Sequence, residues 1–370
     1  MNIADYDGVT EYIAQCRRIV DVHRNVIIFG ASRTGEKVYE LIGGGAEKIV
    51  CVADNDVSRH GTLFHGIEIV SAKEMKRIYD AYDDVVIIIA AGSAHIIKRQ
   101  LLEMGYPEER LVAFVLAHLE MVPTPYQFFH DRIKELENVY EFLEDDKSRE
   151  VFQGLVNFKI TMDSAYLNGI ADCESLQYFD PQIVHFSNEE CFVDCGAFTG
   201  DTLEVFAQNV KNRWSNYYCF EADKGNWRRL NEYIANRELQ NIETFNVGCW
   251  NKKEDLFFAA SGPAGEISRN SADEVIKADS LDHILKNKRI TFIKMDIEGA
   301  ECQALEGAAG IIREQKPVLA ISIYHSLHDF LWIPQMLHDM NRDYRIFIRH
   351  YREMTDSETI CYAIPGRLHN

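Results

Sequence analysis

Three short apolar runs, each predicted to be a β-strand, carry a carboxylate at or near their end: Asp194, Glu221 and Asp296. The carboxyl ends of parallel strands meet at one edge of a sheet, which is where α/β folds bind their ligands. An acid after the second strand accepts hydrogen bonds from ribose hydroxyls, and one carboxylate can accept two of them. The pattern predicts a nucleotide-type ligand, with Glu221 on its ribose.

A glycine-containing turn, Gly196-Ala-Phe-Thr-Gly200, follows the first of these strands and precedes a helix predicted from Thr202 onward. Glycine allows the backbone to approach a ligand closely, and a helix N-terminus offers free N–H groups. A simpler reading of Asp194 is a helix N-cap, because acids favour helix starts. With Glu221 in register, we expect a cofactor to lie beside Asp194, Gly196, Ala197, Thr199 and Gly200.

Taken together, four blocks resemble the FkbM family of S-adenosylmethionine-dependent methyltransferases, over roughly residues 165 to 365: Val193–Thr202, Phe220–Ala222, Ser280–Asp282 and Ile293–Glu301. The Lys-x-Asp-x-Glu-Gly-x-Glu block is more specific than the glycine turn. The resemblance implies an α/β class I methyltransferase fold, with a mostly parallel seven-stranded sheet. It also implies S-adenosylmethionine at the C-terminal edge of that sheet, with Asp194 facing its methionine part, and usually a hydroxyl as methyl acceptor.

Two further positions are predicted to contact the adenosine of that cofactor. Ala222 follows Glu221 directly, and Gly248 follows the third strand, Ile242–Val247, where its backbone can approach the adenine. A glycine at the end of a strand needs no ligand to explain it, so this second assignment has a purely steric alternative.

The fourth strand is predicted to form the reaction edge. Asp296 is expected to position the acceptor or to act as general base, with His325 as the competing base, because histidine suits proton transfer near neutral pH. A buried histidine bonded to a carbonyl is the alternative. Lys294 shares a strand face with Asp296, and we expect it to form a structural ion pair with a neighbouring acid.

A metal centre built from Asp296, His325, His328 and Asp329 was weighed, and we predict none, because two such ligands three residues apart are common by chance. Tyr178 and Phe179 precede the first strand of this region. They either line the cofactor pocket or pack in the core.

A second nucleotide-fold signature lies near the N-terminus. Gly30 and Gly35 follow the apolar strand Asn25–Phe29, and Asp54 lies about 20 residues later, as in dinucleotide-binding folds. Ser32 stands where such folds need a middle glycine. A Rossmann-like domain that keeps this turn for packing alone explains the pattern equally well.

The predicted organisation has three parts. Residues 1–120 form a Rossmann-like domain of nucleotide-binding type, 121–188 a helical connector that packs on the site, and 189–370 the methyltransferase domain. The segment Ser261–Arg269 has the composition of a mobile loop that closes over the site.

Composition excludes several classes of partner. The formal net charge is −19, which disfavours nucleic acid and anionic membrane surfaces. The N-terminus carries acids where a signal peptide needs positive charge, no apolar run reaches membrane-spanning length, and the nine cysteines include no Cys-x-x-Cys pair. We expect a cytoplasmic protein with reduced thiols. Whether it forms a homo-oligomer stays open.

The sequence therefore predicts an S-adenosylmethionine-dependent O-methyltransferase that acts on a sugar or another small molecule. Two alternatives remain open at this point. One is an NAD-dependent or sugar-nucleotide-dependent enzyme centred on the N-terminal domain, and the other is a non-catalytic scaffold that senses a ligand.

Overall fold

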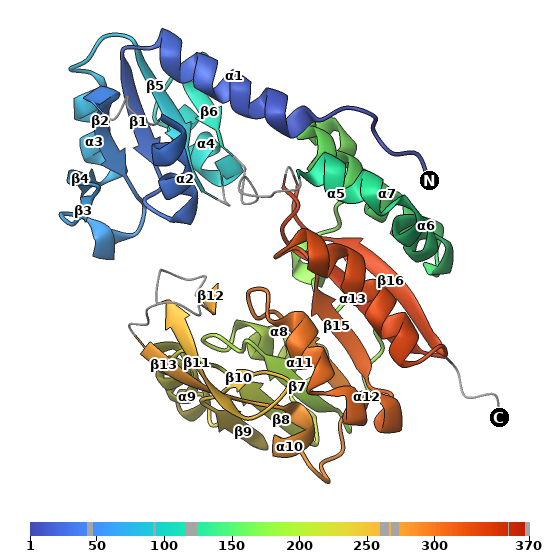
Figure 1. Ribbon diagram of the computed structural model, residues 1–370. Helices are drawn as coiled ribbons and strands as arrows, with labels where there is room; N and C mark the ends of the chain where they lie inside the picture. The colour runs from blue at the N-terminus through green and yellow to red at the C-terminus, as the bar shows by residue number, and fades with distance from the viewer. Residues whose placement is uncertain are drawn as a thin grey trace. The chain divides into compact units, whose positions relative to one another are not determined.

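The computed structural model describes residues 1–42, 47–91, 94–114, 124–259, 266–267, 274–353 and 355–366. The chain forms two compact units (Figure 1). One unit contains residues 4–127 and 157–164, and the other contains residues 1–3, 128–156 and 165–370. No helix within the described ranges is both long and apolar enough to cross a membrane.

The first unit is built on a six-stranded sheet with the order β3-β4-β2-β1-β5-β6, in which every neighbouring pair is parallel except β3 and β4. Strands β1 and β5 are almost wholly apolar and buried, as expected for parallel strands covered on both faces. The elements are α1 (Gly8–Val22), β1 (Asn25–Phe29), α2 (Arg33–Ile42), β2 (Ile49–Ala53), β3 (Leu63–Phe64), β4 (Ile67–Val70), α3 (Ala72–Tyr79), β5 (Val85–Ile89), α4 (Ala94–Glu103) and β6 (Leu111–Ala113).

Alternating side chains of β1 point into two separate cores. Val26 and Ile28 pack with Cys16 of α1 and Val38 of α2. Ile27 and Phe29, on the opposite face, pack with Met75 of α3 and Leu101 of α4. The unit is therefore a three-layer α/β sandwich of the doubly wound type.

The turn after β1 has a steric reason for its glycines. A Cβ on Gly30, where φ is +120°, would lie 2.2 Å from the carbonyl oxygen of Ala90, and a Cβ on Gly35 would lie 2.2 Å from that of Gly30. The carboxylate of Asp54 accepts the backbone N–H groups of Ala31 and Asp56. Packing alone thus explains this signature, and it requires no nucleotide.

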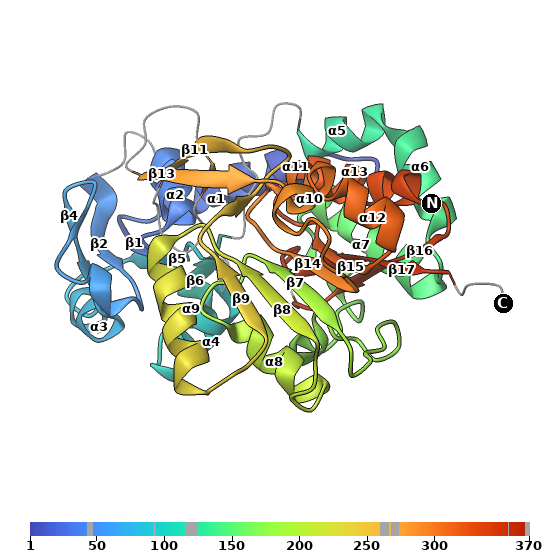
Figure 2. The same ribbon diagram turned by 90° about the horizontal axis from the view of Figure 1, so that it is seen from below.

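The second unit contains a seven-stranded sheet with the order β9-β8-β7-β14-β15-β17-β16, in which only β17 is antiparallel to its neighbours. Figure 2 shows α8 and α9 on one side of this sheet and α11, α12 and α13 on the other. The strands are β7 (Cys191–Cys195), β8 (Asn216–Phe220), β9 (Ile242–Phe245), β14 (Phe292–Met295), β15 (Val318–Ser322), β16 (Tyr344–His350) and β17 (Thr359–Pro365), and the helices are α8 (Asp201–Asn209), α9 (Lys224–Asn236), α10 (Leu281–Ile284), α11 (Glu301–Glu306), α12 (Ala309–Gln315) and α13 (Leu327–Met340).

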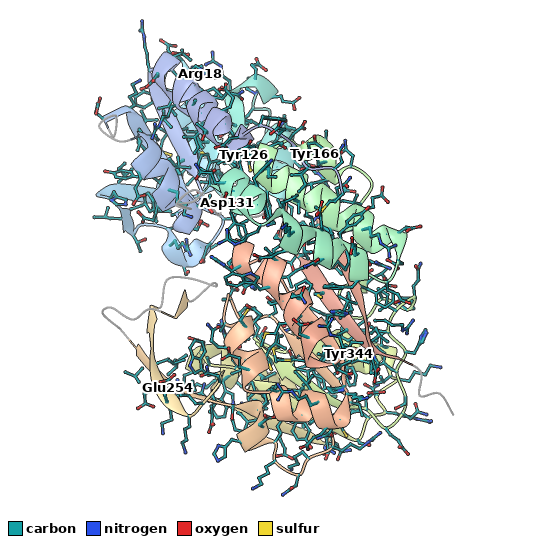
Figure 3. All side chains as sticks on the ribbon, turned by 45° about the vertical axis from the view of Figure 1, so that its right-hand side comes forward. Arg18, Tyr126, Asp131, Tyr166, Glu254 and Tyr344 are labelled. Atoms are coloured by element: carbon teal, nitrogen blue, oxygen red, sulfur yellow. The ribbon has the colours of Figure 1, made fainter. Side chains whose placement is uncertain are left out.

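Aromatic residues dominate the core beneath α8 and α9. The ring of Phe192 stacks between those of Tyr217 and Phe292, with centroid distances of 4.9 and 4.6 Å. Phe206 of α8 packs 4.7 Å from Phe192. Tyr344, labelled in Figure 3, is buried at the start of β16, and its hydroxyl donates to the carbonyl of Pro317. These contacts fix the central strands whose ends carry the predicted site.

A smaller sheet with the order β10-β13-β11-β12 completes this unit. Its strands are β10 (Gly248–Cys249), β11 (Glu254–Ala259), β12 (Glu266–Ile267) and β13 (Glu274–Asp279). Most of the predicted closing loop, residues 261–265 and 268–269, lies outside the described residues.

Helices fill the predicted connector, as the sequence indicates. They are α5 (Pro125–Asp131), α6 (Ile133–Phe142) and α7 (Asp146–Thr161), and Arg132 separates α5 from α6. The unit boundaries fall inside α5 and α7 and do not coincide with the predicted limits at 121 and 188.

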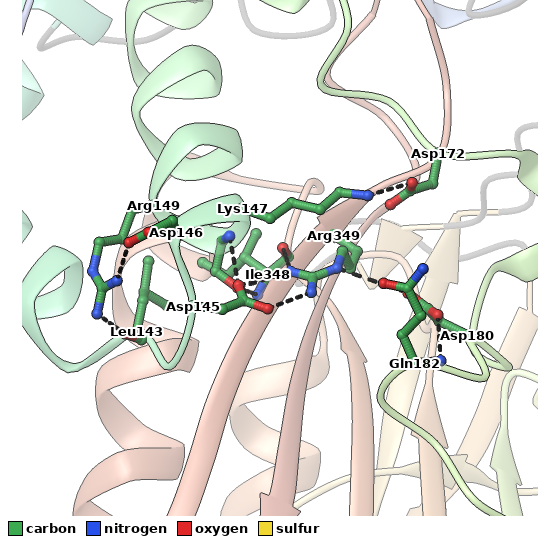
Figure 4. Close-up of polar contacts among 11 residues, drawn as sticks. Leu143, Asp145, Asp146, Lys147, Arg149, Asp172, Asp180, Gln182, Ile348 and Arg349 are labelled. Atoms are coloured by element: carbon green, nitrogen blue, oxygen red, sulfur yellow. Dashed lines mark hydrogen bonds and ion pairs between the residues drawn. The ribbon is translucent and has the colours of Figure 1, made fainter.

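A buried ion-pair network ties α7 to β16 (Figure 4). The guanidinium of Arg349, only 3% exposed, lies 2.6 Å from Oδ2 of Asp145 and 3.7 Å from Oδ2 of Asp180. Asp145 also accepts the backbone N–H and the hydroxyl of Ser148, at the start of α7. Burial alone would raise the pKa of Asp145, but Arg349 and Ser148 lower it to about 2.

Asp145→Asn is expected to destabilise the chain by about 1–2 kcal/mol at pH 7, because Arg349 keeps Asp180 as a partner and Asp145 is partly screened by solvent. The native pKa is depressed, so the contribution of Asp145 is complete above its unfolded value and declines as the pH falls toward about 2. Urea unfolding at pH 7 and pH 3.5 checks this. The difference in the free energy of unfolding between the native chain and the variant must be smaller at pH 3.5. An equal difference at both pH values would contradict an ionic origin of the stabilisation.

Candidate active site

The order of the seven-stranded sheet reverses direction between β7 and β14. From β7 the chain proceeds outward to β8 and β9, and from β14 it proceeds outward in the other direction to β15. At such a switch point the two connecting segments diverge and leave a crevice at the carboxyl ends of the strands, where doubly wound folds bind ligands. The glycine turn after β7 and the residues after β14 both lie at this point.

Packing requires glycine at 196 and 200, whether or not a ligand lies beside the turn. A Cβ on Gly196, where φ is +81°, would lie 2.0 Å from the carbonyl oxygen of Asp296, and one on Gly200 would lie 2.9 Å from the ring of Tyr233. Between them, Ala197 is fully buried in the core, and Thr199 is partly exposed. Close approach of the two strand-end segments therefore explains this turn.

Asp194 is held by two side chains of its own sheet, and its place beside a cofactor stays a prediction. It is fully buried within β7, where its Oδ1 lies 3.0 Å from Nζ of Lys294 and its Oδ2 accepts the hydroxyl of Tyr217. Burial alone would lower the pKa of Lys294, but the carboxylates of Asp194 and Asp296 raise it. The charged Lys294 donates to the carbonyl of Gly196 at 2.8 Å. The predicted ion pair thus exists, and it fixes the turn.

Glu221 lies at the end of β8 and joins the same turn. Its Oε2 accepts the backbone N–H of Phe198 at 2.8 Å, and its Oε1 accepts that of Asp223 at 2.9 Å. Burial raises its pKa, and these two N–H groups partly offset the rise. Each oxygen keeps a second lone pair, so the carboxylate can still accept hydroxyl protons. Asp54 makes the equivalent pair of contacts in the first unit.

A side chain after the third strand, β9, makes hydrogen bonds to the backbone at Glu221. The side-chain amide of Asn246 donates to the carbonyls of Glu221 and Ala222 at 2.9 and 3.0 Å. Gly248 lies next to Ala222, and a Cβ there would meet Ile276 at 3.4 Å and Ala222 at 3.8 Å. These are ordinary contacts. Unlike Gly196, this glycine is not required by the fold.

Asp296 is the centre of a polar cluster after β14. The hydroxyl of Tyr178 donates to its Oδ2 at 2.8 Å, and that of Tyr324 donates to its Oδ1 at 3.1 Å. Nε2 of His325 lies 3.4 Å from the same Oδ1. Burial alone would raise the pKa of Asp296, but His325, Lys294 and the two hydroxyls lower it. The carboxylate is therefore ionised, and 23% of it is exposed.

Three carboxylates surround His325. Besides Asp296, Oε2 of Glu298 lies 3.6 Å from Nε2, and Oε1 of Glu301 lies 3.0 Å from Nδ1. Burial alone would lower the pKa of this histidine, but the carboxylates raise it to about 10. A raised pKa favours the protonated imidazole at neutral pH, whereas the predicted role as base needs the neutral form. Burial raises the pKa of Glu298 to about 7, although His325 opposes this rise.

The structure brings together some predicted residues and separates others. Asp296 and His325 meet because they follow the neighbouring strands β14 and β15. His328 lies apart, against the rings of Phe128 and Trp332. Asp329 accepts hydrogen bonds from Ser326 and Cys302. Neither residue joins the acidic cluster.

Sequence reasoning gave no site role to Tyr324 or Glu301. Tyr324 directly precedes His325 at a predicted strand end, and that position was the available signal. Tyr178 and Phe179 both pack in the core, and the hydroxyl of Tyr178 reaches Asp296; whether either lines a cofactor pocket stays a prediction.

This fold and site define a class. Strand order 3-2-1-4-5-7-6 with one antiparallel strand, a glycine turn after the first strand and acids after the second and fourth are the features of a class I methyltransferase. Residues 194–352 match the family model of the methyltransferase FkbM domain, and residues 22–112 match that of the C2185-like N-terminal domain. Over residues 194–352 the chain is therefore similar to the methyltransferase FkbM domain.

A solved structure shares this fold. Methyltransferase FkbM from Methylobacillus flagellatus KT is 21% identical and superposes with a TM-score of 0.63, covering 96% of this chain and 99% of that chain. An rRNA methylase from Streptococcus thermophilus is 14% identical with a TM-score of 0.34, covering 49% of this chain and 88% of its own. Fibrillarin from Aeropyrum pernix, with natively bound S-adenosyl-L-methionine, is 12% identical with a TM-score of 0.34. The match covers 49% of this chain and 70% of the fibrillarin chain. No curated protein matches the chain.

Proposed function

We propose that the chain transfers the methyl group of S-adenosylmethionine to a hydroxyl of a sugar or another small molecule. The observation that carries this proposal is the placement of Glu221 and Asp296 on the two sides of the glycine turn. Glu221 bonds to the turn, and the carbonyl of Asp296 lies against Gly196. A cofactor whose ribose reaches Glu221 would extend toward Asp296 along one short path.

In this proposal the protein contributes orientation and charge. The carboxylate of Glu221 accepts the ribose hydroxyls, and Asp296 accepts the hydroxyl proton of the acceptor. The acceptor oxygen attacks the methyl carbon, the C–S bond breaks with its electron pair going to sulfur, and the hydroxyl proton passes to a carboxylate of the cluster. The ion pair of Asp194 with Lys294 and the hydroxyls of Tyr178 and Tyr324 hold the groups in place. Such positioning lowers the barrier of an in-line displacement.

The experiment is methyl transfer from S-adenosylmethionine labelled in its methyl group to a panel of free sugars, glycosides and nucleotide sugars. Mass spectrometry should find the label in a product, and mild base should not remove it, because an ether resists the hydrolysis that cleaves a methyl ester. Label on a carboxyl or an amine, with none on hydroxyls, would contradict the O-methyl assignment.

Gly248→Ala tests the adenine position. Because the added Cβ makes only ordinary contacts, we expect the Tm to change by less than about 2 °C. The same Cβ would enter the space assigned to the adenine, and we expect about tenfold weaker binding of S-adenosylhomocysteine, or about 1.4 kcal/mol. Calorimetry and thermal unfolding measure both values. Unchanged affinity would remove Gly248 from the cofactor site.

A further inference from the structure

We propose that Asp296, Glu301 and His325 bind one divalent cation of the Mn²⁺ or Co²⁺ type. Each residue offers one ligand atom, and the three atoms lie within 4.8 Å of one another. Ligands of one cation at about 2.1 Å are at most about 4.2 Å apart, so closing the site needs side-chain movements of about half an ångström or more.

Unsatisfied polar atoms point to a missing ligand in this cluster. His325 has a side chain only 9% exposed, and neither ring nitrogen makes a hydrogen bond of acceptable geometry, although carboxylate oxygens lie 3.0–3.6 Å away. Glu301 is fully buried, and its Oε2 has no hydrogen-bond partner. Buried polar atoms of native proteins normally have partners. A cation would satisfy the imidazole and the carboxylate together.

The local charge also favours a cation. The carboxylates of Asp296, Glu298 and Glu301 surround a single imidazole. The nearby Lys294 is already paired with Asp194. A dication bound between these groups would balance this negative charge.

The mixed donor set selects the type of ion. Two carboxylates and one imidazole offer two oxygens and a nitrogen. Mg²⁺ and Ca²⁺ prefer oxygen ligands alone, structural Zn²⁺ sites have four protein ligands, and catalytic Zn²⁺ sites have more nitrogen or sulfur donors than this cluster. Three protein ligands leave positions open for an exchangeable group. Its role rests on the proposed function: the cation would bind the acceptor oxygen and lower the pKa of its hydroxyl, whose proton still passes to a carboxylate of the cluster as the oxygen attacks the methyl carbon.

Electron paramagnetic resonance of Mn²⁺, titrated into the full chain after chelator treatment, tests the site without any cofactor or acceptor. We expect one bound Mn²⁺ per chain, and at least tenfold weaker binding in both His325→Gln and Glu301→Gln. The matched control is His328→Gln, which alters a histidine three residues away that packs on aromatic rings and should bind Mn²⁺ as the native chain does. Thermal unfolding confirms that each variant folds.

Two results would overturn the proposal: no bound Mn²⁺ up to about 1 mM, or equal binding by the native chain and by folded His325→Gln or Glu301→Gln variants. Full displacement by an equimolar amount of Mg²⁺ would overturn the ion type. Binding of S-adenosylhomocysteine, measured separately, distinguishes this failure from failure of the proposed function. A chain that binds Mn²⁺ but no S-adenosylhomocysteine keeps the metal site and loses the methyltransferase proposal.

Discussion

Replacing Glu221 by Ala should weaken binding of S-adenosylhomocysteine by about 100-fold or more, because a charged hydrogen bond contributes about 1.5–3 kcal/mol and two ribose hydroxyls lose their acceptor. The same change removes the acceptor for the N–H groups of Phe198 and Asp223, so the glycine turn also loses its hydrogen bond to the end of β8. Calorimetry with S-adenosylhomocysteine measures the affinity.

Asp54→Ala is the matched control for this variant. Asp54 accepts the N–H groups of Ala31 and Asp56, just as Glu221 accepts those of Phe198 and Asp223, but it lies in the other unit. The Asp54→Ala variant should lose these two hydrogen bonds to its turn and leave the affinity for S-adenosylhomocysteine unchanged. If Asp54→Ala weakens binding as much as Glu221→Ala, the cofactor does not sit at the carboxyl end of β8.

Asp296→Asn should reduce turnover by about 100- to 1000-fold while changing the affinity for S-adenosylhomocysteine by less than about threefold. The amide keeps the size of the side chain and one acceptor oxygen. The amide has no negative charge, so it cannot take the proton of the acceptor hydroxyl. It also no longer pairs with His325. The rate of labelled methyl transfer to an acceptor found in the panel, with saturating cofactor, measures the effect.

Tyr324→Phe provides the comparison. It removes one hydroxyl that donates to Asp296 and leaves the carboxylate charged and held by Tyr178. We expect a loss of only about tenfold in turnover. Full activity of Asp296→Asn would exclude Asp296 from the reaction, and equal losses in the two variants would reduce its role to positioning.

The sequence predicts the sheet well because its strands are apolar runs buried on both faces. The strands β7, β8 and β14 correspond to the three predicted runs that carry Asp194, Glu221 and Asp296 at or near their ends. Because neighbouring parallel strands end at one edge, their order along the chain also sufficed to bring Asp296 and His325 together. This inference needs only local pattern and the general behaviour of α/β folds.

The remaining features of the site depend on contacts between residues that are far apart in the sequence. Asp194 appeared to face a ligand, but the register of β7 and β14 places Lys294 directly opposite it. Gly196 appeared to make room for a cofactor, but its neighbour is the carbonyl of Asp296, 100 residues later in the chain. Glu301 lies beside His325 only once α11 and β15 are both in place. No local pattern reports such contacts.

The central claim is that the crevice at Glu221 and Asp296 holds S-adenosylmethionine. Isothermal titration calorimetry of the full chain with S-adenosylhomocysteine tests it most directly, because the product binds without turnover and requires no acceptor. The account predicts saturable heat with one site per chain, and loss of that heat in Glu221→Ala. No heat from either S-adenosylhomocysteine or S-adenosylmethionine at high micromolar concentration would contradict it.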